Sequence, residues 1–280
     1  MFPTLLAIGP IHISSFLVFI IFAWLVFSFL FWRELRNQAV TEEHIYNLMF
    51  YGTLAAFVGA RLGFVLSHWQ LFAGNLWIRI FTLWIEPGFS FYGGFLAGGA
   101  VMLMMSRMFS IRRSLFLDAF TTGFSSAFTW GAFAAFLEGS SIGKHTTGVF
   151  GISLPGQGSR VHPVALYEMG AVFFLLLLLY VVRRYRKQTL GKPGLTALWF
   201  FFFFSISMFG LEFLKESPVY FSRLTLNQWI CIGIYGEAVG GLITWGGGKE
   251  WVKTYVPIMY KKVFQKVGGI YAKFSRRNTR

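Results

Sequence analysis

The sequence is poor in cysteine, in charged residues and, at its start, in basic residues. The one cysteine of the 280-residue chain, Cys231, lies in an apolar run, so no disulfide forms within the chain and we expect no thiol chemistry from its own side chains. Only 13% of the residues are charged, about half the share of an ordinary soluble domain. The opening stretch "MFPTLLAIGPIHISS" contains no Lys or Arg, so we expect no cleavable signal peptide.

Long apolar runs take the place of the missing charge. Hydrophobic residues make up 55% of the chain, and the mean hydropathy is +0.59. Runs of about 20 apolar residues match the hydrocarbon thickness of a bilayer, and in lipid such runs must be helical because no other open structure satisfies the backbone. We therefore predict an all-α, polytopic membrane protein. Its seven transmembrane helices are expected at about 12–32, 45–68, 89–108, 115–137, 164–182, 195–214 and 226–245.

The basic residues are distributed unevenly between the two sides of these spans. Most of the 25 Lys and Arg residues fall in alternate connections and in the C-terminal tail. The positive-inside rule therefore predicts an extracytoplasmic N-terminus and a cytoplasmic C-terminus. The net charge of +14 then faces anionic lipid, and we expect no nucleic-acid binding.

The chain divides into a seven-helix membrane domain, residues 1–248, and a basic tail, residues 249–280. Aromatic and aliphatic residues alternate with lysines in the tail, which is typical of an amphipathic helix lying on the inner leaflet. A solvated basic tail is the alternative. Within the membrane domain, a Gly-rich extracytoplasmic loop, residues 138–163, connects the fourth and fifth spans and is full of turn signals.

Several polar residues fall in the outer half of the membrane, although a charge costs on the order of 2.5–3.5 kcal/mol at the bilayer centre. The stretch "RVHPVALYE" opens the fifth span, and its Pro163 suits a first helical turn. The polar residues of this half are Arg61, Tyr92, Glu138, His162, Tyr167, Glu168 and Glu212. Their clustering predicts a polar site at the extracytoplasmic end. Lys144 and Arg160 offer phosphate-pairing charge there, and Lys144 or Lys215 is needed to give every acid a cation.

Each of these residues also has a structural alternative. Arg61 paired with a glutamate locks helices together as readily as it binds a lipid headgroup. Tyr92 is typical of the aromatic belt at a membrane surface, and the glycines after it, Gly93 and Gly94, permit close packing of helices. His162 is equally a helix cap or a proton carrier.

A series of motifs follows in order along most of the chain. They read "IGPIHISSF", "YGTLAAFVGARLGFVL", "GFSFYGGFLAGG", "EGSSIGKHTTGVFGISLPG", "VHPVALYE", "FGLEFLKE" and "LNQWICIGI". The most specific patterns are H-P-x-x-L-Y-E after a glycine-rich loop and G-x-R-x-G in the second span. In these motifs the chain resembles prolipoprotein diacylglyceryl transferases, seven-span bacterial enzymes that move diacylglyceryl from phosphatidylglycerol to the cysteine thiol of a lipoprotein.

The chain departs from the family pattern at several positions. Tyr92 stands where the family has a histidine before paired glycines. The fourth-span pattern G-R-x-x-N-F-x-N-x-E-x-x-G here reads "GAFAAFLEGSSIG", so its arginine is Ala132, its second asparagine Glu138 and its glutamate Ser140. Met208 replaces the arginine four residues before the sixth-span glutamate. Both missing arginines belong to the part of the pattern associated with the phosphoglycerol headgroup.

Together with the residues above, the resemblance implies a site on the outer leaflet of a bacterial cell membrane. The expected catalytic residues are Tyr92, Glu168 and Glu212. The expected headgroup-binding residues are Arg61, Gly93, Gly94, Lys144, Arg160, His162 and Tyr167. The implied partners are phosphatidylglycerol or another anionic phospholipid and the lipobox peptide of a prolipoprotein, and we expect no metal and no cofactor.

Two other functions remain compatible with the sequence. The first is a non-catalytic relative that binds lipid or lipoprotein without transfer, which the loss of the two arginines favours. The second is a transporter that uses Arg61, Glu168 and Glu212 as a charge relay, although the chain shows none of the internal repeats common in transporters.

Overall fold

The structure is a computed structural model that describes residues 4–8, 11–72, 88–153, 160–185, 192–217, 219–246 and 248. The expected amphipathic tail, residues 249–280, and the centre of the Gly-rich loop lie outside the described residues. The described part is mostly helical, and its sheets have two strands each. The all-α class is therefore confirmed.

Each of the seven predicted spans corresponds to a helix of 18 or more residues. These helices are α1 (Ser15–Asn37), α2 (Glu42–Ser67), α5 (Phe91–Met108), α6 (Arg113–Glu138), α7 (Val164–Tyr185), α9 (Leu195–Glu212) and α10 (Leu226–Thr244). Four of them, α1, α2, α7 and α9, are by length and composition apolar enough to cross a membrane. A four-residue helix, α3 (Trp69–Phe72), follows α2.

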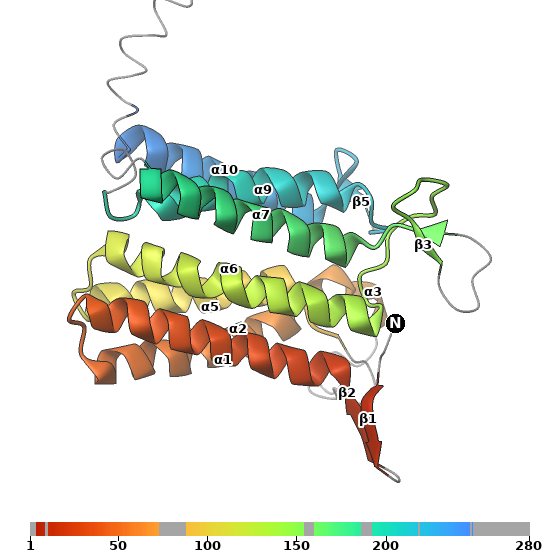
Figure 1. Ribbon diagram of the computed structural model, residues 1–280, viewed down its shortest axis with the longest axis horizontal. Helices are drawn as coiled ribbons and strands as arrows, with labels where there is room; N and C mark the ends of the chain where they lie inside the picture. The colour runs from red at the N-terminus through yellow and green to blue at the C-terminus, as the bar shows by residue number, and fades with distance from the viewer. Residues whose placement is uncertain are drawn as a thin grey trace, which may run out of the picture.

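Three short hairpins lie at one end of the helices (Figure 1). They pair β1 (Thr4–Ile8) with β2 (Ile11–Ser14), β3 (Ile152–Ser153) with β4 (Arg160–Val161), and β5 (Val219–Phe221) with β6 (Leu224–Thr225). The first span was expected at about 12–32, and α1 spans Ser15–Asn37. The apolar residues of β2 bond to β1 instead, so α1 begins at Ser15.

The seven long helices form two groups (Figure 1). One group contains α1, α2, α5 and α6, the other contains α7, α9 and α10, and α6 packs on α7 where the groups meet. Phenylalanines fill much of the core, and Phe124 of α6 lies edge-on to Phe204 of α9 with 5.6 Å between ring centroids. Such edge-to-face pairs are favoured because the positive edge of one ring meets the negative face of the other.

Glycines bring α2 and α5 into backbone contact. A Cβ added to Gly63 of α2 would lie 2.9 Å from the Cα of Gly93, and one added to Gly94 would lie 3.1 Å from the Ala56 carbonyl oxygen. Small residues permit this approach, which gains van der Waals contact between helices in lipid. This close approach is the packing role that the sequence offered as one alternative for Gly93 and Gly94.

A carboxylate of α6 caps the start of α9. Asp118 accepts hydrogen bonds from the backbone nitrogen of Gly194, at 2.6 Å, and from that of Ala197, at 3.3 Å. Gly194 has φ +88°, a conformation that glycine adopts without strain. The first N–H groups of a helix have no partner within it, so this contact satisfies two of them and joins the two helix groups.

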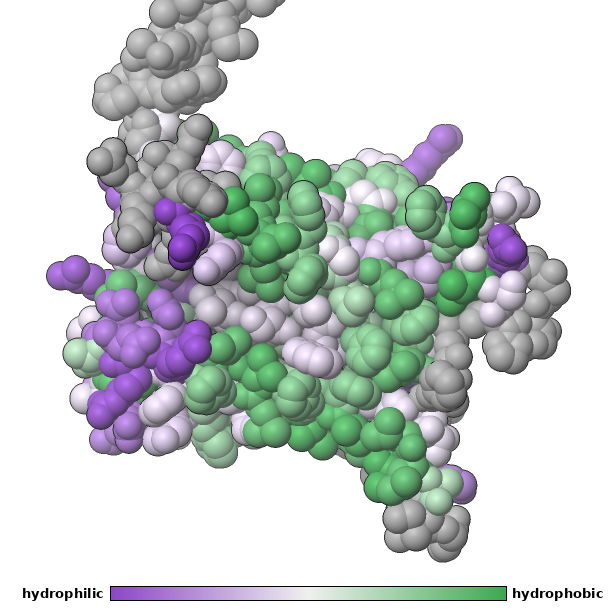
Figure 2. All heavy atoms as spheres, viewed as in Figure 1, coloured by the Kyte–Doolittle hydropathy of each residue, from purple (hydrophilic) through white to green (hydrophobic). Residues whose placement is uncertain are grey.

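The surface is divided along the helix axes. Apolar side chains cover much of the visible face, and hydrophilic ones gather at the end opposite the hairpins (Figure 2). Arg36 in the last turn of α1 pairs there with Glu42, the first residue of α2, at 3.4 Å. This apolar belt and polar end agree with a bundle that spans a membrane.

Candidate active site

Two of the three sequence-predicted acids, Glu168 and Glu212, meet at the end of the molecule that carries the hairpins. α7 begins there after Pro163, α9 ends there at Glu212, and α10 begins there. Thr225 caps α10 by accepting a bond from the Gln228 backbone nitrogen, while the Gln228 side chain accepts one from the Thr225 nitrogen. This capping box fixes the direction in which α10 leaves the site.

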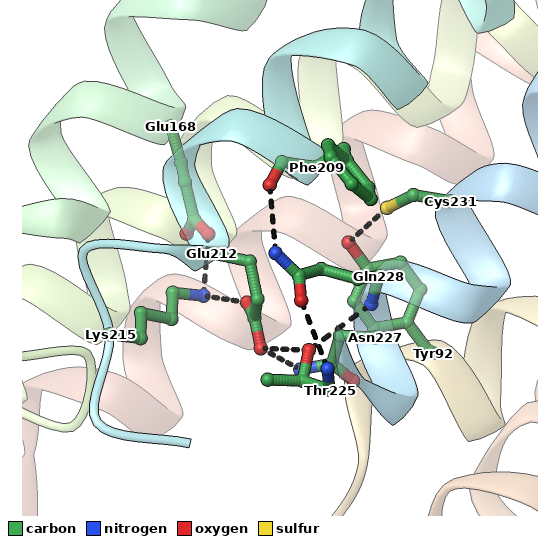
Figure 3. Close-up of polar contacts among 9 residues, drawn as sticks. All are labelled: Tyr92, Glu168, Phe209, Glu212, Lys215, Thr225, Asn227, Gln228 and Cys231. Carbon is green, nitrogen blue, oxygen red and sulfur yellow. Dashed lines mark hydrogen bonds and ion pairs between the residues drawn. The ribbon is translucent and has the colours of Figure 1, made fainter. Parts of the chain in front are cut away.

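Lys215 lies between Glu168 and Glu212 (Figure 3). Its ammonium is 2.6 Å from the Oε1 of Glu168 and 3.6 Å from the Oε2 of Glu212. The Lys215, Glu168 and Glu212 side chains are 22%, 14% and 3% exposed. We call these three residues the Lys215 cluster. Because the three charges are largely withdrawn from water, their attraction is stronger than that of a surface ion pair.

The ionisation of Lys215 reflects both burial and charge. Burial opposes the ammonium form, but the nearby carboxylates of Glu168 and then Glu212 more than offset this, so the pKa of Lys215 is raised above its ordinary value. Lys215 is therefore a permanent cation at neutral pH.

The second oxygen of Glu212 is held by α10. The Oε1 of Glu212 accepts hydrogen bonds from the Thr225 hydroxyl at 3.2 Å and from the Asn227 amide at 2.8 Å. The Gln228 amide, which is also buried, donates to the Phe209 carbonyl at 3.4 Å. The end of α9 and the start of α10 are thus joined through side chains on both sides of Glu212, which fixes the direction of that carboxylate.

Tyr92 meets Cys231 across the two helix groups. The Tyr92 hydroxyl of α5 lies 3.3 Å from the Cys231 sulfur of α10, and both residues are buried (Figure 3). Cys231 follows Asn227 by one helical turn, so this contact lies directly beside the Glu212 interactions. The sequence did not single out Cys231 as a site residue, because one cysteine in an apolar run carries no signal of its neighbours.

Arg61 occupies a different environment from the Lys215 cluster. The side chain is buried, and its Nη1 donates to the Gly88 carbonyl at 3.1 Å. Its guanidinium lies over the rings of Phe64 and Phe72, at 5.8 and 5.5 Å from their centroids. The cation that meets Glu168 and Glu212 is Lys215, which the sequence offered only as one of several possible partners.

The Gly-rich loop is bonded to the segment that carries Lys215. The Lys144 ammonium donates to the Phe213 carbonyl at 3.0 Å, and the Lys144 backbone nitrogen donates to the Leu214 carbonyl at 2.7 Å. The His162 backbone nitrogen donates to the Lys144 carbonyl at 3.1 Å. Lys144 is thereby placed beside the residues that lead from Glu212 to Lys215.

The other predicted residues of this end have partners or exposure of their own. The Nδ1 of His162 lies 3.3 Å from the Tyr167 hydroxyl, which donates to the Phe150 carbonyl at 3.1 Å. Arg160 is exposed in β4, and Glu138 is exposed at the end of α6. His162 and Tyr167 therefore bond to each other and to the loop, while Arg160 is accessible from solvent.

The two positions where the family pattern has arginine are apolar and buried. Ala132 is 7% exposed in α6, and Met208 is 3% exposed in α9, one turn before Glu212. Among the described residues, no group of three or more His, Cys, Asp or Glu side chains is placed to hold a metal ion. The charged chemistry of the described site therefore depends on Lys215, its two carboxylates and the cations of the loop.

Comparison with known proteins identifies similar sequences. The family model of prolipoprotein diacylglyceryl transferase matches residues 3–244. A protein of Tropheryma whipplei (strain Twist) named phosphatidylglycerol–prolipoprotein diacylglyceryl transferase is 26% identical over 217 residues, which cover 73% of this chain and 78% of the relative. Proteins of the same name from Streptococcus mutans and Paracidovorax citrulli are 25% and 28% identical, over 82% and 87% of this chain and 90% and 94% of each relative.

Proposed function

Because the chain belongs to the prolipoprotein diacylglyceryl transferase family, we propose that it transfers the diacylglyceryl group of phosphatidylglycerol, or of another anionic phospholipid, to the cysteine thiol of a prolipoprotein. The observation that carries this proposal is the Lys215 cluster. It combines a permanent cation with two carboxylates at one end of a membrane-spanning bundle. This combination suits a reaction that removes a proton and releases a phosphate.

The reaction exchanges one bond to carbon for another. The thiol sulfur forms a C–S bond to the glycerol carbon as the C–O bond to the phosphate breaks, and glycerol phosphate leaves with the bonding electron pair. The thiol proton goes to a carboxylate. Glu168 suits this role better than Glu212, because Glu212 already accepts bonds from Thr225 and Asn227. A positioned carboxylate base contributes about 10²–10⁴-fold to such a step.

Lys215 supplies charge where the leaving phosphate becomes more negative. Electrostatic stabilisation of this kind is usually the largest contribution to catalysis. Glu212 orients Lys215 and balances its charge before the lipid binds. Tyr92, which stands where the family pattern has histidine, is proposed to contact the reacting groups from α5 through its hydroxyl.

Further cations are proposed to replace the missing arginines at the headgroup. Lys144 lies beside the segment that carries Lys215, and Arg160 is exposed on the same loop system. Arg61, Gly93, Gly94, His162 and Tyr167 complete the proposed headgroup site. Lysine binds phosphate as a point charge without the planar fork of arginine, so we expect binding that discriminates weakly among anionic lipids.

The site is proposed to face the extracytoplasmic side. Basic residues concentrate at the opposite end of the bundle, near Arg36, Arg107 and Arg113. Cytoplasmic connections carry such an excess of Lys and Arg. This orientation puts the N-terminus outside, the C-terminus in the cytoplasm, and the Lys215 cluster at the outer leaflet of the cell membrane.

A transfer assay tests the function. Purified protein is incubated with phosphatidylglycerol and a peptide that contains a lipobox cysteine, and the thioether-linked product is measured by mass spectrometry. We expect product with wild type and a loss of at least a hundredfold with Glu168→Gln. A folded, lipid-binding protein that forms no product would remove the enzymatic function.

The alternative is a relative that binds lipid or lipoprotein without transfer. The observation in its favour is that Ala132 and Met208 are buried and apolar at the two positions of the family arginines. Binding of phosphatidylglycerol by wild type, Lys144→Ala and Arg160→Ala at low and moderate salt separates the cases. A tenfold loss, about 1.4 kcal/mol, in the absence of any transfer activity supports this alternative.

A further inference from the structure

An acidic side chain lies on the outer surface of α10, one of the seven spans predicted from the sequence. Glu237 belongs to α10, and its side chain is exposed between the two ends of the helix. No ion pair of Glu237 occurs among the residues that the structure describes. A carboxylate within the hydrocarbon is costly and rarely kept without a partner, so its exposure points to a cation that the described residues do not supply.

Glu237 shares its helix face with a row of exposed residues. At 3.6 residues per turn, this face consists of Leu226, Trp229, Gly233, Gly236, Glu237 and Gly240, all of them exposed. We call it the outward α10 face. A Cβ added to any of its three glycines would meet nothing within 4 Å. The opposite face of α10, with Cys231 and Ala238, is buried. The outward face thus offers a shallow apolar surface with one negative charge.

The outward α10 face begins at the same end of the bundle as the Lys215 cluster. Asn227, in the first turn of α10, donates to Glu212 of the cluster. From Asn227 to Glu237 the helix rises about 15 Å. A signal segment has a basic end, an apolar stretch of about 7–15 residues and then its processing site. As a helix, this apolar stretch is about 10–22 Å long, so its two ends match the positions of Glu237 and the cluster.

We propose that the outward α10 face docks the signal helix of the prolipoprotein. The helix runs antiparallel to α10, with its basic end against Glu237 and its lipobox cysteine at the Lys215 cluster. This inference rests on the proposed function, because the substrate defines the occupant. A second copy of the chain fits less well, since a two-fold contact through this face repeats the same patch on both partners. It would bring two Glu237 side chains together without a cation, and like charges oppose association.

Reversing the charge on the peptide and on the protein tests the docking. A fluorescent signal peptide with two lysines at its basic end, and the same peptide with two glutamates, are titrated with the full chain in nanodiscs of neutral phosphatidylcholine. We expect wild type to bind the lysine peptide at least tenfold more tightly than the glutamate peptide. Glu237→Lys should reverse this preference, and Glu237→Gln should abolish it.

Glu43→Lys is the matched control, because Glu43 is exposed in the first turn of α2 at the end near the C-terminus of α10. It should keep the wild-type preference. The inference is overturned if wild type binds both peptides equally, or if Glu237→Lys and Glu43→Lys behave alike. A photoreactive residue in place of Gly240 should label the peptide, whereas labelling only a second copy of the chain also overturns the inference.

Binding in this experiment requires no catalysis, so the outcome is separable from that of the transfer assay. Charge-dependent docking without any thioether product would leave the surface standing and remove the transferase function. Product formation together with equal binding of both peptides would leave the transferase function standing and remove the docking surface. The comparison of the lysine and glutamate peptides on wild type uses no substituted protein, so a folding defect in Glu237→Lys does not affect it.

Discussion

Lys215 and Glu168 form an ion pair 2.6 Å long, although 47 positions of sequence separate them. The pair joins the segment after α9 to the start of α7, and the same ammonium lies near Glu212. One lysine thus serves two carboxylates from two helices. Its removal leaves both acids without the cation that the structure gives them.

Lys215→Met should destabilise the protein and stop transfer. Removing one partner of a buried ion pair costs about 3–5 kcal/mol, and we expect the lower end because Lys215 is 22% exposed. Thermal unfolding in detergent measures the stability, and the transfer assay measures the activity. Lys215→Arg keeps the charge and should retain most of both. Equal stability of Lys215→Met and wild type would contradict the role of the cluster.

The contribution of Lys215 to stability should decrease in the alkaline range. Its pKa is raised above the ordinary 10.5, so the folded state binds this proton more tightly than the unfolded state. The stabilisation is complete below the unfolded pKa and is lost as the pH rises through the folded pKa. The difference in stability between wild type and Lys215→Met should be constant from pH 7 to about 10 and decrease above it. A difference in stability that grows above pH 10 would contradict this prediction.

Tyr92→Phe separates a chemical role of the hydroxyl from a structural one. The hydroxyl bonds to the Cys231 sulfur, and loss of one such hydrogen bond costs about 0.5–1.5 kcal/mol. If Tyr92 takes part in proton transfer, the rate falls about a hundredfold or more with only this small change in stability. Cys231→Ser keeps a hydroxyl partner for Tyr92 and should remain active. An active Tyr92→Phe would remove Tyr92 from the catalytic residues.

Gly93→Ala should destabilise the contact between α2 and α5. An added Cβ would overlap the Gly59 carbonyl oxygen, and such overpacking costs about 1–3 kcal/mol. Gly170→Ala on α7 is the control, because a Cβ there meets nothing within 4 Å. Since alanine favours a helix over glycine by about 1 kcal/mol, the control should be neutral or stabilising. Thermal unfolding of both variants decides, and equal effects would contradict the packing described.

Cysteine labelling tests the proposed orientation. In a Cys231→Ser background, Lys144→Cys should react with a membrane-impermeant maleimide in spheroplasts, and Lys192→Cys should react only after permeabilisation. The reason is the excess of basic residues at the end of the bundle that includes Lys192. Labelling of both positions from the same side would contradict the predicted topology and, with it, the proposal that the site faces the outer leaflet.

The sequence predicted the helices well because hydrophobic length alone specifies a span. It also placed Glu168 and Glu212 at one end of the bundle, since positions along a spanning helix translate directly into depth. It did not identify Lys215 as their common partner. That contact depends on how residues 213–215 turn back toward α7, and no periodic pattern encodes the path of an irregular segment.

The β1–β2 hairpin and the Tyr92–Cys231 contact were missed for related reasons. β1 and β2 together are only nine residues long, and their apolar composition looks the same as the start of a span. Cys231 meets Tyr92 only because α10 approaches α5 at the hairpin end. Contacts between helices distant in sequence depend on their relative rotation, which the composition of either helix leaves open.

The strand-like bonding of the Gly-rich loop bears on how the sequence can diverge. Gly143 pairs with Lys215 as an isolated bridge, and its nitrogen donates to the His162 carbonyl at 2.8 Å. These bonds use main-chain atoms, which every residue except proline supplies. The backbone position of Lys215 therefore demands a glycine at 143, where an added Cβ would lie 2.7 Å from the Leu214 carbonyl oxygen, but its main-chain bonds do not depend on the side chains of Lys144 and His162. Lys144 and His162 can be exchanged by mutation over evolutionary time while the cation stays in place, so the surroundings of the site can adapt to other headgroups one substitution at a time.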